Sequence, residues 1–150
     1  MSNALLTKAQ LRRHIRRHVG AELYDETDGE RQGTAIYTLA DPRDIRFVRY
    51  VGQTSAPRKR FVQHLNTARL WLPEEIPWCV KSPQLRPLYE WIRELYRDEC
   101  RLPTMVVYEW VEPQPQARIV ERTRIYECLQ KGLPLLNVEA EILERQIPLI

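Results

Sequence analysis

The chain has 150 residues, of which 43% are hydrophobic and 29% are charged, and this balance excludes a disordered or fibrous protein. A chain of this length forms one ordinary domain and can bury a core without disulfide or metal staples. The net charge of +3 is modest, so the distribution of charge along the chain is more informative than its total.

The cysteines and the first residues of the chain bear on its compartment. Cys79, Cys100 and Cys128 are widely spaced and odd in number, which argues against a disulfide framework and against a Cys-x-x-Cys zinc site, so we expect reduced thiols. Residues 1–4 lack the charged start and apolar stretch of a secretory signal. No apolar run approaches the length that crosses a bilayer. We therefore expect a cytoplasmic protein with no membrane partner.

A basic helix is predicted at the N-terminus. Thr7 and Gln10 have the spacing of a capping box, in which each side chain bonds to the other residue's backbone amide. Apolar residues then recur at helical spacing as far as Gly20, which predicts a helix over about residues 8–19. Its remaining surface carries Arg12, Arg13, Arg16 and Arg17. Residues 25–33 are acidic and aperiodic, which indicates a linker or loop.

A β-hairpin and a helix are predicted next. Residues 34–39 and 45–52 are rich in β-branched and aromatic side chains, and turn-forming residues 41–44 separate them. Thr54 or Ser55 can cap the helix that follows, and Pro57 suits its first turn. The expected buried stripe of this helix consists of Phe61, Leu65, Ala68 and Leu72, with Arg60 and His64 on a neighbouring face.

Three more elements are predicted in the second half of the chain. Residues 69–84 contain three prolines together with Trp71 and Trp78, and indicate an irregular insertion. An amphipathic helix resumes near Leu85. Residues 104–111 have the composition of a third strand, and residues 116–130 that of a last helix ending at Lys131 and Gly132.

Several separated residues fit one known pattern. Ala35-Ile36-Tyr37 lies on the first strand and Tyr50-Val51-Gly52 ends the second. Arg60 and His64 follow as Arg-x-x-x-His on the next helix, while Glu121 in the last helix and Asn137 come later. In this order they resemble the signature of the GIY-YIG nuclease family. The resemblance covers residues 33–138 and departs from the family at Ala35, where the first motif has glycine.

The resemblance and the order of the elements together predict the fold class. We expect an α+β domain over residues 33–138, with a three-stranded, mostly antiparallel sheet flanked by helices. Residues 1–32 would add the basic N-terminal helix and a linker, and residues 139–150 a C-terminal tail.

The resemblance implies a metal-dependent endonuclease that hydrolyses DNA phosphodiester bonds. Such hydrolysis needs an activated water, a cation for the developing charge and a stabilised leaving group. Glu121 is the expected ligand of one Mg²⁺ or Mn²⁺, with waters and phosphate oxygens as the other ligands. Without the family, the alternative for Glu121 is an exposed helical ion pair with Arg118 or Arg124. Its apolar neighbours on the helix favour the metal role, because a buried carboxylate without a partner is costly.

Tyr37 is implied to activate water, and Tyr50 to orient the water or the phosphate. A phenol has a pKa of about 10, so it acts as a base near neutrality only where nearby cations depress that pKa. From β propensity alone, both tyrosines would be core or cross-strand packing residues.

The remaining matched residues have supporting roles. Arg60 is expected to stabilise the charge of the phosphate through its guanidinium fork, and His64 to contact phosphate or relay a proton. A solvated basic face is the alternative for both. Asn137 is expected to support the site through hydrogen bonds or to be purely structural.

Clustered positive charge indicates DNA as the partner. Residues 1–20 carry five basic and no acidic groups, and residues 34–72 carry seven basic and two acidic groups. The expected DNA contacts, which position a duplex without reading its sequence, are Arg12, Arg13, Arg16, Arg17, Gln53 and Lys59. For the four arginines, a solvated helix face is the alternative.

Two other functions remain open at this point. One is a catalytically silent DNA-binding module of the same fold. The other is an interaction protein that docks through the insertion with Trp71 and Trp78, which predicts no salt-dependent affinity for DNA. For a nuclease, specificity would come from the basic helix, the insertion, a homodimer, a partner protein or DNA shape.

Overall fold

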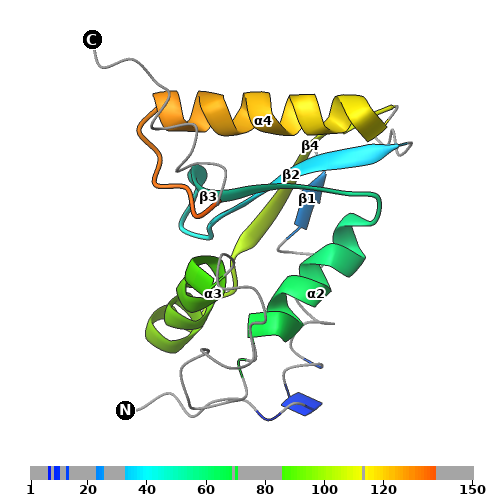
Figure 1. The fold of residues 1–150 in the computed structure, drawn as a ribbon. Helices are drawn as coiled ribbons and strands as arrows, with labels where there is room; N and C mark the ends of the chain where they lie inside the picture. The colour runs from blue at the N-terminus through cyan, green and yellow to red at the C-terminus, as the bar shows by residue number, and fades with distance from the viewer. Residues whose placement is uncertain are drawn as a thin grey trace.

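The computed structural model describes residues 7, 9–10, 13, 23–25, 33–68, 70, 86–112 and 114–137 (Figure 1). In chain order the elements are β1 (Leu23–Asp25), β2 (Thr34–Asp41), β3 (Asp44–Thr54), α2 (Pro57–Ala68), α3 (Arg86–Glu99), β4 (Thr104–Val111) and α4 (Gln114–Gln130). The predicted order of hairpin, two helices, strand and helix is confirmed.

The sheet has four strands in the order β1-β4-β2-β3. β2 pairs antiparallel with β3 and β4, whereas β1 pairs parallel with β4. The α+β class with flanking helices is therefore confirmed, but the expected three-stranded sheet is wrong by one parallel strand. β1 has three residues, too few for a period-2 pattern, and Leu23 pairs with the distant Met105. It lies within residues 1–32, where only a helix and a linker were expected.

The hairpin turn forms as its residues predict. Asp41 pairs with Asp44 across the turn, which leaves two residues in the loop. The carboxylate of Asp41 accepts a hydrogen bond from the backbone N–H of Arg43 at 2.9 Å, the local bond that makes aspartate a turn residue.

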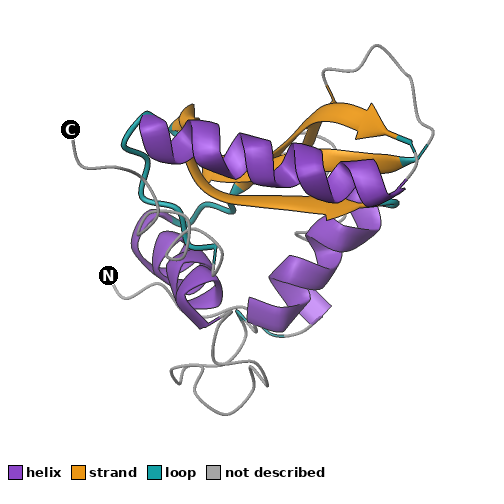
Figure 2. Ribbon diagram, turned by 45° about the horizontal axis from the view of Figure 1, so that its top comes forward, coloured by secondary structure: helices purple, strands orange, loops and turns teal. Residues whose placement is uncertain are grey.

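The sheet is covered on both faces. Alternate residues of a strand point to opposite faces, so Tyr37 and Leu39 pack with α2 and α3, whereas Ile36 packs with α4. Figures 1 and 2 show α4 along one face of the sheet, with α2 and α3 on the other. The strand β3 lies at the sheet edge, where the two faces meet.

The last helix ends in a glycine motif. Gly132 has φ +77°, and its N–H donates to the carbonyl of Leu129 at 3.0 Å, while the N–H of Leu133 donates to the carbonyl of Cys128 at 3.1 Å. These two bonds form a Schellman motif, which requires the left-handed conformation that glycine adopts without strain. The predicted termination at Gly132 is confirmed.

The N-terminal capping box is also confirmed. The N–H of Thr7 donates to Oε1 of Gln10 at 2.9 Å, and the N–H of Gln10 donates to Oγ1 of Thr7 at 3.1 Å. Residues 9, 10 and 13 are helical. The rest of the predicted basic helix lies outside the described residues.

Other expected segments also lie outside the described residues. They are residues 69 and 71–84 of the predicted insertion, which include Trp71 and Trp78, residue 85 at the expected start of the next helix, and the tail over residues 139–150. Cys100 is exposed, Cys128 is buried, and both are free thiols as expected. In the described part of the chain, no helix combines the length and the apolar character that a membrane span requires.

Candidate active site

Tyr37 lies against Gly52, its partner across the β2–β3 pair. A Cβ atom at position 52 would lie 2.5 Å from Cζ and from Oη of Tyr37, closer than any side-chain carbon approaches. The glycine of the second tripeptide therefore makes room for the tyrosine of the first. Tyr37 is 1% exposed, so its hydroxyl needs a partner inside the protein.

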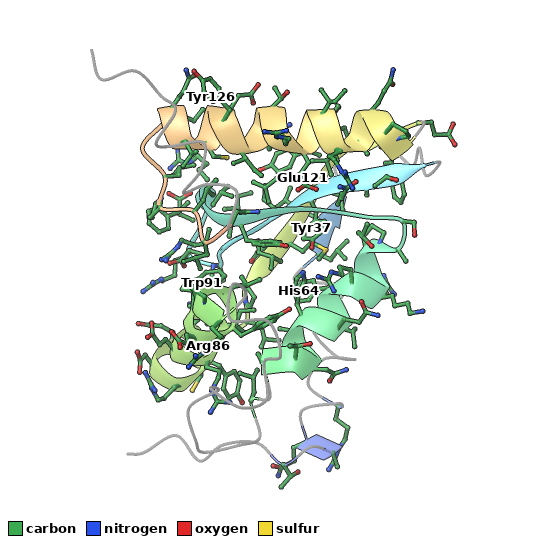
Figure 3. All side chains as sticks on the ribbon, viewed as in Figure 1. Tyr37, His64, Arg86, Trp91, Glu121 and Tyr126 are labelled. Carbon is green, nitrogen blue, oxygen red and sulfur yellow. The ribbon has the colours of Figure 1, made fainter. Side chains whose placement is uncertain are left out.

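His64 provides that partner. Phe61 and Leu65 bury one side of α2 against the sheet, and His64 beside them is 1% exposed. Its Nε2 lies 2.7 Å from the hydroxyl of Tyr37, and its ring meets that of Tyr37 edge-on with centroids 6.0 Å apart. Figure 3 shows the two residues on the side of the sheet that α2 covers. The alternative of a solvated basic face is therefore wrong for His64.

Tyr50 and Arg60 complete the polar cluster, which we define as Tyr37, Tyr50, Arg60 and His64. The ring centroid of Tyr50 lies 6.3 Å from that of Tyr37 and 5.7 Å from that of His64. The positive charge of Arg60 acts on both tyrosines and opposes the rise that burial causes in their pKa values. Both Tyr50 and Arg60 are partly exposed, so the cluster meets solvent on their side.

The electrostatics of the polar cluster determine its charges near neutral pH. Burial and then Tyr50 raise the pKa of Tyr37 far above its usual value, although Arg60 opposes the shift. Burial and then Arg60 lower the pKa of His64 to about 3. Burial lowers the pKa of Arg60, but the surrounding phenols raise it above its usual value. The resting cluster therefore holds neutral phenols, a neutral imidazole and one guanidinium cation.

Glu121 approaches the cluster from the other face of the sheet. It points from α4 toward the strands in Figure 3 and is partly exposed. Burial raises the pKa of Tyr50, Arg60 opposes this, and the negative charge of Glu121 adds to the rise. The carboxylate thus acts on Tyr50 at the sheet edge. Arg124, one of its expected ion partners, lies 4.3 Å over the ring of Tyr108 and 3.8 Å from Glu109.

A metal here would have one carboxylate from the protein. Among the described residues no three His, Cys, Asp or Glu side chains gather as metal ligands. Glu121 fits the single hard oxygen ligand that Mg²⁺ or Mn²⁺ takes where water and phosphate oxygens complete the shell.

Asn137 binds backbone rather than the cluster. Its Oδ1 accepts from the N–H of Val51 at 2.9 Å, and its Nδ2 donates to the carbonyl of Val51 at 2.7 Å. The N–H of Leu136 also donates to the carbonyl of Arg49 at 2.6 Å. The segment after α4 thus covers the free edge of β3, and this placement fits both roles expected for Asn137, support of the site and a purely structural one.

The predicted DNA contacts are described in part. Arg13 and Lys59 are exposed, and Gln53 is partly buried with an Oε1 atom that has no hydrogen-bond partner among the described residues. Arg12, Arg16 and Arg17 lie outside the described residues.

Tyr89 on α3 also belongs to the site, although no motif indicated it. Its hydroxyl lies 3.2 Å from Nδ1 of His64, and the residue is 2% exposed. A signal was present in the sequence: Tyr89 stands at helical spacing with Ile92 and Tyr96, which are both buried, and a hydroxyl on a buried stripe needs a partner. The pattern did not indicate which partner.

Within the described chain, the site brings together an acceptor for a water proton, a cation for a phosphate and a carboxylate at the sheet edge. This set of groups is suited to hydrolysis of a phosphate ester. Comparison of the sequence with models of protein families and with curated proteins, and of the structure with solved structures, found no match.

Proposed function

We propose that this protein is a metal-dependent endonuclease that hydrolyses a DNA phosphodiester bond, as its resemblance to the GIY-YIG nucleases implies. The observation that carries the proposal is the convergence of Tyr37, Tyr50, Arg60 and His64, four residues from three elements, into one polar cluster. Residues that matched a motif only in sequence would have no reason to meet in space.

Arg60 is the proposed phosphate-binding group. Its guanidinium is partly exposed and carries the positive charge of the cluster. A phosphate bound there would offset part of the repulsion that Arg60 exerts on a protonated His64. Substrate binding would therefore make His64 a stronger base than it is in the free protein.

Proton transfer then follows the hydrogen bond between Tyr37 and His64. Water gives a proton to the oxygen of Tyr37 while the hydroxyl proton of Tyr37 moves to Nε2 of His64, 2.7 Å away. The hydroxide forms a bond to phosphorus, the bond from phosphorus to the leaving oxygen breaks, and that oxygen takes a proton from solvent. A relay of this kind does not require free tyrosinate, which burial disfavours.

Glu121 is the proposed ligand for one Mg²⁺ or Mn²⁺. Such a cation supplies positive charge for the phosphate oxygens and lowers the pKa of bound water. Tyr50, which lies between the charges of Glu121 and Arg60, would orient the phosphate at the sheet edge.

Cleavage of plasmid DNA with Mg²⁺ or Mn²⁺ tests this proposal. Tyr37→Phe and Glu121→Gln should each lower the rate by at least about 100-fold, the usual contribution of an acid–base or electrostatic group. Matched controls are Tyr126→Phe and Glu127→Gln, which alter exposed residues on α4 and should cut at the original rate. Cleavage that persists in both site variants would rule out this active site.

A catalytically silent DNA-binding module is the second candidate. The burial of Tyr37 and His64 favours it, since each is 1% exposed and both are held as packed, neutral groups. In that case the protein binds DNA with no cleavage under any divalent cation. A linear, supercoiled, branched and single-stranded panel of DNA would separate this outcome from a structure-specific nuclease.

A further inference from the structure

Arg49 lies at a bulge on the edge of the sheet. Two successive residues of β2 pair with Tyr50 and with Val48, so the register of the two strands passes over Arg49. The extra residue of a bulge leaves the regular pairing, and its side chain is turned to a new direction. The carbonyl of Arg49 accepts a hydrogen bond from the N–H of Leu136 at 2.6 Å, which fixes the backbone at this point.

Two aromatic rings hold the guanidinium of Arg49. Its Cζ lies 5.5 Å from the ring centroid of Trp91 and 6.0 Å from that of Phe47, distances at which a ring attracts a cation. Trp91 belongs to the core and is labelled at α3 in Figure 3. Phe47 differs, since 38% of it is exposed. The guanidinium therefore contacts one buried ring and one ring that solvent reaches.

The positive charge of Arg49 is not neutralised by an ion pair. Among the described residues no carboxylate forms a salt bridge with it, and its buried Nε has no hydrogen-bond partner. Burial lowers the pKa of Arg49, and the charges of Glu94 and then Asp41 oppose that shift. Asp41 is already paired with Arg43 at 2.7 Å. Because buried donors are normally satisfied, a partly buried guanidinium with a free donor is suited to an anionic ligand.

The neighbours of Arg49 indicate which anion fits. Tyr50, the next residue, belongs to the polar cluster, so a phosphate on Arg49 would lie beside the phosphate proposed for Arg60. The exposed ring of Phe47 offers a flat surface on which a nucleobase can stack. Bases inside a duplex stack on one another and present only their edges to a protein, so this ring would take an unpaired base.

We propose that Arg49 and Phe47 bind the nucleotide next to the scissile phosphate, with its phosphate on the guanidinium and its unpaired base on the ring. The inference rests on the proposed function and specifies its substrate as DNA with an unpaired strand at the cut, such as a fork or a flap. It accounts for both the free donor of Arg49 and the exposure of Phe47.

The affinity for a short oligothymidylate, measured by fluorescence anisotropy in EDTA so that nothing is cut, tests the phosphate contact. Arg49→Met keeps a long side chain against Trp91 but removes the charge. It should reduce the slope of log affinity against log salt by about 0.7, the value for one phosphate contact in a single strand. Arg49→Lys keeps the charge and should keep the slope. Arg46→Met is the matched control and should keep it too, because Arg46 is already paired with Asp44 at 3.1 Å.

Substitution of Phe47 tests the stacking of the base. Phe47→Ala should lower the affinity for oligothymidylate by about 5-fold to 150-fold, the usual contribution of one stacked base, and Phe47→Trp should retain it. An oligomer with the same sugar–phosphate backbone but no bases should bind the wild type and Phe47→Ala equally. Ile45→Ala, which alters an equally exposed apolar residue of β3, is the control and should bind as the wild type does.

Cleavage of a forked and of a blunt duplex with Mg²⁺ supplies the second readout. The wild type should cut the fork faster, and Phe47→Ala should lose this preference. An unchanged salt slope in Arg49→Met, or an equal loss in Phe47→Ala for oligomers with and without bases, overturns the nucleotide site even if DNA is cut. The expected binding results in a protein that never cuts DNA refute the proposed function, while the site for an unpaired strand stands.

Discussion

Gly52 leaves space for the ring of Tyr37, because a side chain at position 52 would clash with the phenol. A Cβ atom would lie 2.5 Å from the phenol, so Gly52→Ala should displace the ring and destabilise the protein by about 1 to 3 kcal/mol, as overpacking does. Chemical denaturation measures this loss. In a Tyr37→Ala background the penalty should disappear, because the clash has been removed.

Gly132→Ala is the matched control for that prediction. Nothing lies within 4 Å of the Cβ that it adds, so its penalty comes from φ +77° alone and should be about 1 kcal/mol. This penalty should be the same with and without Tyr37. If the Gly52→Ala penalty also survives in Tyr37→Ala, the close approach is not what restricts position 52.

His64 should make the protein sensitive to acid. The folded protein keeps the ring neutral down to about pH 3, whereas the unfolded chain takes up a proton below about pH 6.5. In that window the unfolded state binds more protons, so the free energy of unfolding falls as pH falls. The stability lost by pH 3 amounts to roughly 4 kcal/mol, by the usual conversion of a pKa shift.

Denaturation of the wild type and of His64→Gln from pH 7.5 to pH 3 isolates this contribution. Other groups titrate equally in both proteins, so the wild type should lose stability more steeply than the variant below pH 6.5. Parallel curves would mean that the buried ring does not resist protonation.

Single residues also show how far a sequence can be interpreted. The resemblance singled out Tyr37, Tyr50, Arg60 and His64, and the structure brings these four side chains together. Tyr89 could not be assigned to the cluster, because its contact with His64 depends on how α3 packs against α2. Local pattern indicates that a hydroxyl is buried, but only tertiary packing decides its partner.

The two hydrogen bonds between Asn137 and the backbone of β3 can be tested by substitution. Its amide satisfies both the N–H and the carbonyl of Val51 on the free edge of that strand. Asn137→Ala leaves both groups unpaired and should destabilise the protein by about 2 to 4 kcal/mol. Hydrogen exchange at the Val51 amide should accelerate. Loss of cleavage with unchanged exchange at Val51 would instead indicate a chemical role for Asn137.

The elements that are marked by turn or capping residues within their own sequence were predictable. The strand β1, which depends on pairing with a distant segment, was not. The hairpin turn follows from the short carboxylate of Asp41, and the end of α4 from Gly132. β1 is different, since Leu23 gains strand structure only by pairing with Met105 far along the chain. A strand of three residues is too short to show the alternation of apolar and polar residues that would predict it.

For the whole molecule, the sheet edge organises the site. Arg60 on α2 and Glu121 on α4, helices that cover opposite faces of the sheet, both act on the pKa of Tyr50 on the edge strand β3. No central strand could do this, because its neighbours would separate the two faces. A cation and a phosphate would need this access from both sides.

Measurement of DNA affinity tests whether the basic residues at the start of α2 contact phosphate. Lys59 is exposed in the first turn of α2, next to Arg60, and a lysine that contacts phosphate releases one counterion on binding. Without divalent cations, the affinity for duplex DNA should fall as salt rises. Lys59→Ala should reduce the slope of log affinity against log salt by about 0.9, the value for one phosphate contact.

Arg46 is the matched basic residue for this measurement. It is exposed near the hairpin turn, and its guanidinium pairs with Asp44 at 3.1 Å, so its charge is largely offset before DNA arrives. Arg46→Ala should leave the slope unchanged. Equal losses in both variants would indicate diffuse attraction to the whole surface. The absence of any salt-dependent affinity for DNA would exclude binding through phosphate contacts and favour a protein that docks on other proteins.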